Sequence, residues 1–415
     1  MQDAIPIIDP SLTPPPIKGV AAIAHLAFAG QGLDDLLKVI SHPVTSQPMM
    51  AALALDSALA HMLTFRPQQA SAMQSLALSR ASLFRVADSF ASRGSRPLRV
   101  LALMVPGDLM MNTPLDFITA HLDVQLDLMF VLPGRPLPER MPDHDVAFFA
   151  VSESDPAALR RLAPMFPLWP RPALNDPARV VRLTRNGVAA ALGHAPGVAT
   201  PRIVAISRDD LLAYLGRGKP IGNLLPGCGY PVLLRPVGTH AGIGLARLDG
   251  PAALAAHLAE HPTERLFLAN FIDYRGPDGL FRKYRVAFIG GTPFVCHMAA
   301  SEHWMVHYLN AGMVESGARR ALEAEAFADF DSGFARRHRA AFAAIDGWIS
   351  LDYHQIDCAE TPDGRLLLFE ADTAAIVHMM DPPDMFPYKV PQMRRVVEAF
   401  GAMLGRRAAG ALAAA

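Results

Sequence analysis

One segment near the C-terminus, DCAETPDGRLLLFEAD at residues 357–372, constrains the fold more than any other. Two runs of strand length flank Pro-Asp-Gly, which is a turn signal, so the segment predicts an antiparallel β-hairpin. A two-residue turn at Pro362-Asp363 would place Asp357 opposite Leu368. A three-residue loop would shift this pairing by one position and change which side chains share a face.

With the two-residue turn, alternation along the strands puts three carboxylates on one face of the hairpin, beside Leu368. They are Asp357, Glu370 and Asp372. The other face is apolar and can pack on a core; it carries Ile356, Cys358, Leu367, Phe369 and Ala371. Diagonal neighbours on a β-ladder lie roughly 7 to 8 Å apart at the backbone, a gap that side-chain oxygens and a divalent ion can bridge. Three uncompensated carboxylates would repel one another, and Mg²⁺ or Mn²⁺ would remove that cost. A solvated hairpin face with ordinary surface acids is the alternative.

A glycine-rich loop is the second informative feature. The segment YPVLLRPVGTHAGIGLARL, residues 230–248, predicts a strand, a loop with Gly238, Gly242 and Gly244, and a second strand. Glycines allow backbone N–H groups to approach a phosphate, and Arg235 at the strand end could contact it as well. The loop lacks the Lys-Ser/Thr of a P-loop and leads into a strand, unlike a Rossmann fingerprint. A hairpin loop without a ligand is the alternative.

The first half of the chain predicts helices followed by an α/β domain. Residues 18–92 carry Ala, Leu and Met at helical spacing, interrupted by prolines, and predict about three helices. Thr113, followed by Pro114 and Asp116, predicts a capped helix start. Strands and helices alternate over residues 97–172, which is typical of a small parallel α/β domain. The strands are expected at Leu98–Val105, Leu126–Val131 and Val146–Val151.

The second half mixes helices with antiparallel strands. A helix is expected at about 178–192, and a first hairpin is expected to turn at Gly290-Gly291. The fold class that we expect is therefore mixed, α/β and α+β. The tail RRAAGALAAA is of low complexity, and we expect it to be frayed.

Composition excludes several classes of function. The chain of 415 residues has 38 Lys and Arg against 39 Asp and Glu, a balance that argues against nucleic acid as a partner. Its apolar runs are far shorter than the roughly 20 residues of a membrane helix. The N-terminus does not have the pattern of a signal peptide, so we expect a soluble, cytoplasmic protein without membrane partners. Three scattered cysteines predict buried free thiols.

The order of these features resembles the ATP-grasp superfamily, particularly its ribosomal-protein glutamate ligase-like and glutathione synthetase-like branch. In that pattern LLRP corresponds to a strand, and GTHAGIG corresponds to a mobile loop over the phosphates. FRKYRVAFIGGTPFV corresponds to a hairpin with an arginine near its start. Asp followed by Glu-x-Asp corresponds to the metal ligands. The likeness covers roughly residues 97 to 400. It implies an N-terminal helical accessory region at 1–95, a pre-ATP-grasp α/β domain at 96–174, a lid at 175–268 and a C-terminal subdomain with the metal site at 269–405.

The resemblance implies a reaction and a set of site residues. A carboxylate would attack the γ-phosphate of ATP, and an amine or thiol would capture the acyl phosphate. Arg235 and Arg285 would be the catalytic cations, and Asp357, Glu370 and Asp372 would bind Mg²⁺ or Mn²⁺. The residues implied in ATP binding are Arg185, Arg235, Gly238, Thr239, His240, Gly242, Gly244, Leu268, Asn270, Phe271 and Asp273.

The substrate of such a ligase would be an amino acid, a peptide or a small metabolite. The segment SEHWMVHYLNAGM supplies candidate contacts, because the family's acceptor pocket lies in this region; they are His303, Trp304, His307 and Asn310. On a helix, His303 and His307 would share one face. Packing of Trp304, with the histidines on the surface, is the structural alternative. The chain could also assemble as a homo-oligomer.

The sequence departs from the family pattern in three places. Arg235 stands where lysine is usual, Arg185 is the nearest candidate for a missing lid lysine, and Asp372 replaces asparagine. Only five of the 38 basic residues are lysines, so arginine at these places fits a general drift of the chain. Either cation can bind phosphate. The leading hypothesis is an ADP-forming ligase, and the alternative is a decayed relative that acts as a nucleotide-binding regulatory or scaffold module.

Overall fold

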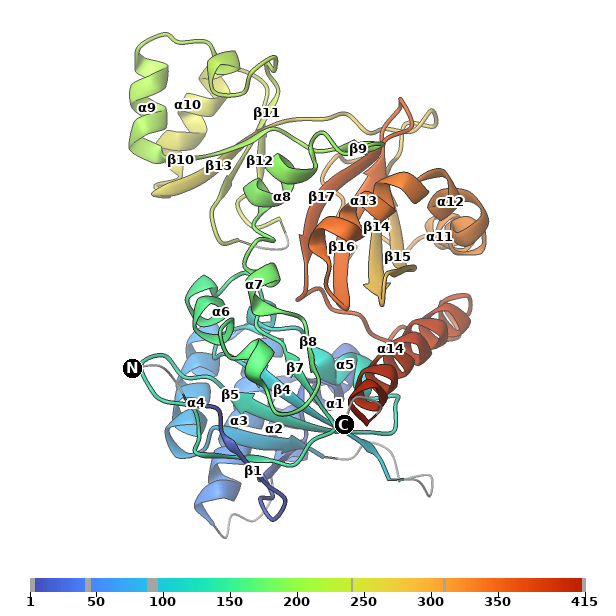
Figure 1. Cartoon of the computed structure of the whole chain (residues 1–415). Coiled ribbons are helices and arrows are strands. Elements are labelled where there is room, and N and C mark those ends of the chain that lie inside the picture. The colour runs from blue at the N-terminus through green and yellow to red at the C-terminus, as the bar shows by residue number, and fades with distance from the viewer. Residues whose placement is uncertain (1–3, 42–45, 88–95, 240–241, 309–310, 413–415) are drawn as a thin grey trace.

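The computed structural model describes residues 4–41, 46–87, 96–239, 242–308 and 311–412. Figure 1 shows a lower part that contains the N-terminal helices and a large sheet, and two smaller parts above it, each with its own sheet. The long helix α14 (Lys389–Leu412) contacts both the lower part and the C-terminal sheet. The expected mixed α/β class is confirmed.

The first part is built on a six-stranded sheet with the order β2-β3-β5-β4-β7-β8. Its last four strands are parallel, as the alternating pattern predicts. The strands are β2 (Pro16–Ile17), β3 (Leu83–Val86), β4 (Leu98–Met104), β5 (Val124–Phe130), β7 (Val146–Phe149) and β8 (Ala173–Leu174). Two further strands, β1 (Ile7–Asp9) and β6 (Arg140–Pro142), pair with each other. Helix α6 (Pro156–Leu162) begins where Asp155 accepts a hydrogen bond from the Ala158 N–H.

The N-terminal helices are integrated into this first part, contrary to the prediction of an accessory region at residues 1–95. Between β2 and β3 the structure has α1 (Val20–Phe28), α2 (Leu33–Ile40), α3 (Gln47–Leu63) and α4 (Pro67–Arg80), one more helix than expected. Strand β3 pairs with β5, so the sheet extends across the predicted boundary. Leu55 of α3 and Phe84 of β3 share one core. Sequence pattern missed the two flanking strands because they are only two and four residues long.

The predicted helix cap at Thr113 is wrong. Helix α5 (Leu115–Thr119) has no side-chain cap, and Asp116 instead accepts a hydrogen bond of 3.0 Å from the Ala21 N–H at the start of α1. Gly19 has φ +82°, and a Cβ there would lie 2.4 Å from Asp116 Oδ2. The carboxylate therefore caps a helix that is about a hundred residues away in sequence, a contact that local spacing does not reveal.

The second part is a four-stranded antiparallel sheet with the order β10-β13-β11-β12. Its strands are β10 (Ile203–Ser207), β11 (Val232–Pro236), β12 (Ala246–Leu248) and β13 (Arg265–Asn270). Helices α9 (Arg208–Gly216) and α10 (Pro251–Glu260) pack on it through Leu211 and Leu254. The helix expected at 178–192 is two helices, α7 (Pro177–Val180) and α8 (Arg185–Leu192). Short 3₁₀ turns lie at Leu109–Met111, Phe166–Leu168 and Ile221–Asn223.

The third part is a five-stranded sheet with the order β15-β14-β16-β17-β9. Both predicted hairpins are present in it. The strands are β9 (Val198–Ala199), β14 (Phe281–Ile289), β15 (Thr292–Ser301), β16 (Tyr353–Glu360) and β17 (Leu366–Asp372). The helices are α11 (Gly317–Asp329), a π-helical turn (Phe330–Phe334), α12 (Ala335–Arg337) and α13 (Arg339–Ile349).

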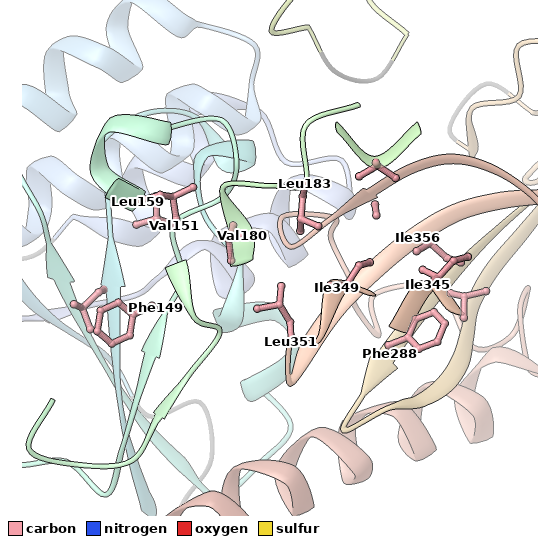
Figure 2. Packing of buried hydrophobic residues seen from close by; sticks show 14 of the residues in the cluster. Phe149, Val151, Leu159, Val180, Leu183, Phe288, Ile345, Ile349, Leu351 and Ile356 are labelled. Carbon is pink, nitrogen blue, oxygen red and sulfur yellow. The ribbon is translucent and has the colours of Figure 1, made fainter. Parts of the chain in front are cut away.

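A continuous apolar core joins the first part to the third. Val151 follows β7, and Val180 lies in α7 (Figure 2). Together with Leu183 they belong to the same apolar cluster as Leu351 and Ile356 of the C-terminal part. These side chains are buried. The end of β7 is therefore held close to the sheet that carries the acidic hairpin.

The acidic hairpin forms, but with a different register from the predicted one. The Thr361 N–H donates to the Arg365 carbonyl, so the loop has three residues, and Gly364 takes φ +80° in it. A register shift between Asp357 and Cys358 compensates, and Asp357 pairs with Glu370. Directly opposed residues share a face of the sheet, so the expected side-by-side carboxylates are present.

The register shift also corrects the predicted apolar faces. Leu368 was expected beside the acids, but it packs in the core with Ile356 and Cys358. Leu367 was expected in that core, but it packs with Ala359 in another cluster. Because the loop is one residue longer than predicted, the side chains of β17 between the turn and the bulge point to the opposite face from the predicted one. The bulge adds one residue, so the side chains beyond it return to the predicted faces.

The C-terminal tail is helical where a frayed end was expected. Residues 406–412 continue α14, consistent with the high helix propensity of alanine and arginine. Within the described residues, no helix combines the length and apolarity needed to span a membrane.

Candidate functional site

A buried carboxylate bound by two cations forms the centre of the site. Arg285 of β14 donates to Asp357 of β16 through Nε (2.8 Å) and Nη2 (3.1 Å), and Lys283 Nζ lies 2.7 Å from Asp357 Oδ2. The Asp357 side chain is 2% exposed. Burial alone would raise the pKa of this carboxyl, but Arg285 and Lys283 hold it well below its usual range. Asp357 is therefore ionised and fixes both cations on one face of the sheet.

Lys283 is a site residue that the sequence analysis missed. It lies two positions before Arg285 on β14, so strand alternation places both side chains on the same face. That spacing could have identified it. It is also one of only five lysines in the chain.

Two arginines from different elements converge next to the acidic hairpin. Arg185, the first residue of α8, forms an ion pair with Glu370 of β17. Arg235, at the end of β11, donates to the carbonyl and the hydroxyl of Thr239, and its buried Nε has no hydrogen-bond partner among the described residues. Burial and the nearby charge of Arg185 lower the pKa of Arg235 to about 10. The two guanidinium groups are therefore near enough for their charges to repel each other.

The remaining acids of the site are crowded. Asp372 accepts hydrogen bonds from the N–H groups of Ala374 (3.0 Å) and Ala375 (2.7 Å). Burial and the charge of Glu370 raise the pKa of Asp372 to about 7. Burial and the charge of Asp372 likewise raise the pKa of Glu153 to about 8. Asp372 and Glu153 therefore hold their protons to a higher pH than free carboxyl groups do.

Glu153 was also missed by the sequence analysis. It follows β7 in the first part, more than two hundred residues before the hairpin. Ligand-binding residues of parallel sheets gather beyond the carboxyl ends of the strands, and Glu153 has that position. The strand end was visible in the sequence, but its proximity to Asp372 was not.

The described residues do not form a complete metal site by themselves. No group of three or more His, Cys, Asp or Glu side chains among them is arranged to hold a metal ion. Asp357 is bound by Arg285 and Lys283, which leaves Glu370 and Asp372 as oxygen donors. Mg²⁺ typically binds one or two carboxylates together with substrate phosphates. The residues thus fit Mg²⁺ held between the protein and a nucleotide, and not a cage made by the protein alone.

The glycine loop follows β11 and reaches the C-terminal part. Gly238, Gly242 and Gly244 have φ values of +81°, +75° and +68°, a conformation that favours glycine. The Thr239 hydroxyl donates to the Pro236 carbonyl at 3.0 Å. A Cβ on Gly242 would lie 3.2 Å from Met305 Sδ, so the loop contacts the segment that contains the predicted substrate residues. The predicted His240 lies outside the described residues.

The residues predicted to hold adenine and ribose have other partners in this structure. Leu268 is buried in the core of the second part, and Asn270 Oδ1 accepts from the Arg202 N–H at 2.7 Å. The Asp273 carboxylate binds the guanidinium of Arg275. The Phe271 ring packs in a T-shaped arrangement with the ring of Trp304 in the predicted substrate segment, with the ring centroids 5.9 Å apart.

Residues 302–307 of the predicted substrate segment form an irregular loop, not a helix. His303 is exposed, and its backbone N–H donates to Ser301 Oγ. Trp304 packs against Phe271, and its carbonyl accepts from Tyr274 Oη at 2.6 Å. His307 is half-buried, and burial with the charges of Lys283 and Arg285 lowers its pKa. The charges of Lys283 and Arg285 therefore act on His307, while Asn310 lies outside the described residues.

Comparisons with known proteins give similarities of overall fold. No family model matches the chain, and no curated protein matches it. Among solved structures, the chain is similar to the VanG D-Ala:D-Ser ligase from Enterococcus faecalis, with 12% identity over 74% of this chain and 99% of that chain and a TM-score of 0.48. It is also similar to a RimK domain ATP-grasp protein from Sphaerobacter thermophilus, with 15% identity over 74% and 98% and a TM-score of 0.42.

A third similar structure is the D-alanine–D-alanine ligase from Bacillus anthracis complexed with ATP. It has 13% identity over 72% of this chain and 98% of that chain, with a TM-score of 0.41. These neighbours are ligases and an ATP-grasp protein. Because each TM-score is below 0.5, the case for a function rests on the side chains of the site.

Proposed function

We propose that this protein is an ATP-dependent, ADP-forming ligase that joins a carboxylate to a nucleophile on a small molecule or peptide. The observation that carries the proposal is the convergence of Arg185 and Arg235 beside the acids of the C-terminal hairpin. Cations from two elements that meet next to carboxylates can take a phosphate chain together with a divalent cation. Catalysis of phosphoryl transfer needs positioning and charge neutralisation more than a nucleophilic side chain.

Arg235 and the backbone of the glycine loop would bind the phosphates of ATP, and Arg185 would turn from Glu370 to meet them. Glu370 and Asp372 would hold Mg²⁺. When bound, Mg²⁺ supplies charge neutralisation for the phosphates. Arg247 lies over the Phe271 ring at 4.5 Å, and the base would stack on the other face of that ring.

The acid substrate would bind beside Arg285. Its carboxylate oxygen attacks the γ-phosphorus of ATP, the bond to the β–γ bridging oxygen breaks, and ADP leaves. The nucleophile then attacks the acyl carbon, inorganic phosphate leaves, and the nucleophile loses a proton. Arg285 would stabilise the negative charge of the acyl phosphate and of the tetrahedral intermediate. Asp357 keeps the guanidinium in place through two hydrogen bonds.

The test is ADP release by the full-length protein with Mg·ATP across a panel of amino acids and peptides. Hydroxylamine serves as an additional nucleophile, because it converts an acyl phosphate to a hydroxamate. We expect ADP and phosphate only when Mg²⁺ and a suitable acid are present. Nucleotide binding without Mg²⁺, together with no ADP from any acid and acceptor, would contradict ligase activity.

Matched variants locate the site. Glu370→Ala should abolish turnover, because it removes a proposed metal ligand. His303→Ala, on an exposed side chain, should reduce it much less, and Glu398→Ala on the exposed face of α14 should leave it unchanged. Near-native rates in both Glu370→Ala and His303→Ala would remove the basis for this site.

A nucleotide-binding module without ligase chemistry is the second candidate function. The observation that favours it is that the described carboxylates do not form a metal group on their own, because Arg185, Lys283 and Arg285 bind to them. Such a module would bind ATP with an affinity that does not depend on Mg²⁺. A Mg²⁺ titration of nucleotide affinity therefore separates the two candidates.

A further inference from the structure

A buried ion pair lies next to the predicted substrate segment, and the proposed phosphoryl transfer does not use it. Glu323 of α11 is 0% exposed, and Lys389, the first residue of α14, is 3% exposed. Lys389 Nζ lies 3.6 Å from Glu323 Oε1 and donates to Asp381 Oδ2 at 3.1 Å. Lysine is almost never fully buried unless it is paired. The chain has only five lysines among its 38 basic residues, and this one places a compact ammonium group between two acids.

The pair holds Tyr308, which directly follows residues 302–307, the substrate loop. The Tyr308 hydroxyl donates to Glu323 Oε2 at 3.0 Å and accepts from Lys389 Nζ. Tyr388 donates to the same carboxylate oxygen at 2.7 Å. Hydrogen bonds with a charged partner are roughly twice as strong as those between neutral groups. The end of the substrate loop is thus tied to α11 and to the start of α14.

Glu323 also holds the strand that lies beside the proposed cations. Strand β15 is at the edge of its sheet, and its Met298 N–H donates to Glu323 Oε1 at 3.0 Å. The preceding residue, His297, pairs directly with Arg285 of β14, so both side chains share a face of the sheet. The rings of His297 and Tyr308 pack together with their centroids 4.7 Å apart. Contacts therefore lead from Glu323 through Tyr308 and His297 to the position of Arg285.

The substrate loop is tied at a second point as well. Tyr274 Oη donates to the Trp304 carbonyl at 2.6 Å. His307 lies between the two tied residues, and the charges of Lys283 and Arg285 act on it. The loop is therefore held on both sides of a residue that is close to the cations of β14.

We propose that Glu323 and Lys389 are positioning residues of the ligase. Through Tyr308 they hold the substrate loop beside the cations of β14, where the acid substrate would bind; this assignment rests on the proposed function. A loop that is fixed in advance loses less conformational entropy when a substrate binds, and it keeps the substrate in a reactive geometry. Loss of the tie should therefore weaken the binding of the acid and not that of the nucleotide.

A titration of His307 tests the tie without a substrate. The histidine side chains are followed by NMR against pH in the full-length protein, without nucleotide or metal. In the parent protein, burial and the cations of β14 lower the pKa of His307, while Asp357 and Glu370 act in the opposite direction. In Tyr308→Phe, which keeps the ring and loses both hydrogen bonds of the hydroxyl, this pKa should rise toward its ordinary value of about 6.5. An unchanged pKa of His307 would overturn the proposal.

Charge variants assign the effect to the buried pair. Glu323→Gln keeps an acceptor for the tyrosine hydroxyl and loses the charge, so it should give part of the rise. Glu323→Leu combined with Lys389→Met removes the pair as a whole and should give all of it. Glu325→Gln, on an exposed residue of the same helix, is the matched control and should change nothing. If urea unfolding shows a loss of stability in the double variant while the pKa of His307 stays at the parent value, the pair only stabilises the fold and the proposal is wrong.

The turnover of the same variants separates this proposal from the ligase function. With each amino acid or peptide that releases ADP from the parent protein, Tyr308→Phe should raise the KM for that acid at least about tenfold and leave the KM for ATP unchanged. A higher KM for ATP with an unchanged KM for the acid would overturn the proposal. Absence of ADP from the parent protein with every acid would contradict the ligase function, whereas the titration of His307 would still decide whether Glu323 and Lys389 hold the loop.

Discussion

Replacing Asp357 with asparagine should destabilise the protein by about 3 to 5 kcal/mol, the range expected when one partner of a buried ion pair is removed. The carboxylate is 2% exposed and forms ion pairs with both Arg285 and Lys283. Asparagine keeps the volume but removes the charge that pairs with two partly exposed cations. The loss is measured as a shift in urea unfolding followed by far-UV circular dichroism, with hydrogen exchange on β14 and β16 as a local readout.

Two further variants make this test specific. Asp331→Asn removes a partner of the exposed ion pair with Arg395, and it should cost less than about 1 kcal/mol. Adding Lys283→Met to Asp357→Asn should recover part of the lost stability, because it removes one of the two opposed cations. If Asp357→Asn costs no more than the exposed control, Asp357 does not hold the cation pair together.

Three other perturbations have outcomes that follow from the structure. Burial raises the pKa of Asp116 to about 6, so the folded state binds this proton more tightly than the unfolded state. The protonated carboxyl therefore stabilises the fold fully below about pH 4, and this contribution is lost as the pH rises through about 6. The loss in the free energy of unfolding is at most about 3 kcal/mol, and Asp116→Asn should remove this pH dependence, as measured by urea unfolding at a series of pH values. Gly244→Ala should weaken ADP binding about tenfold, because its φ is +68° and a Cβ would lie 2.8 Å from Pro236 Cδ, whereas Gly250→Ala, with no atom within 4 Å, should not; equal affinities by calorimetry would contradict this. Arg235→Lys should retain ADP binding and Arg235→Met should lose it at least tenfold, since either cation can bind phosphate; if Arg235→Met binds normally, the phosphates are elsewhere.

Much of the site could be predicted from the sequence because it depends on local alternation. The acids of the hairpin share a face as expected, since a period of two fixes the relation of Glu370 to Asp372 whatever the turn does. Their alignment with Asp357 was predicted from a two-residue turn. The structure reaches it through a three-residue loop and a bulge, which shift the register in opposite directions.

Other features depend on contacts between distant segments and could not be predicted. The charge of Asp372 acts on Glu153, which follows Val151, and Val151 shares one apolar core with Leu351. Asp116 caps α1 and not its own helix α5, because the packing of the first part brings its carboxylate to the start of α1. Strand β3 was missed because four residues carry too little periodicity to distinguish a strand from a loop.

The near-neutral composition of the chain has a local counterpart in the proposed site. Arg185, which would bind phosphate, pairs with Glu370, which would bind a metal, while Arg285 and Lys283 pair with Asp357. In the proposed function, an incoming phosphate chain that draws Arg185 away would free Glu370 for a cation, and a cation bound there would release Arg185 for phosphate. Nucleotide and metal affinities are then linked through one ion pair, since each ligand removes the competitor of the other. The Asp357 cluster need not open in this exchange, because its carboxylate already holds two cations on the face where the acid substrate would bind.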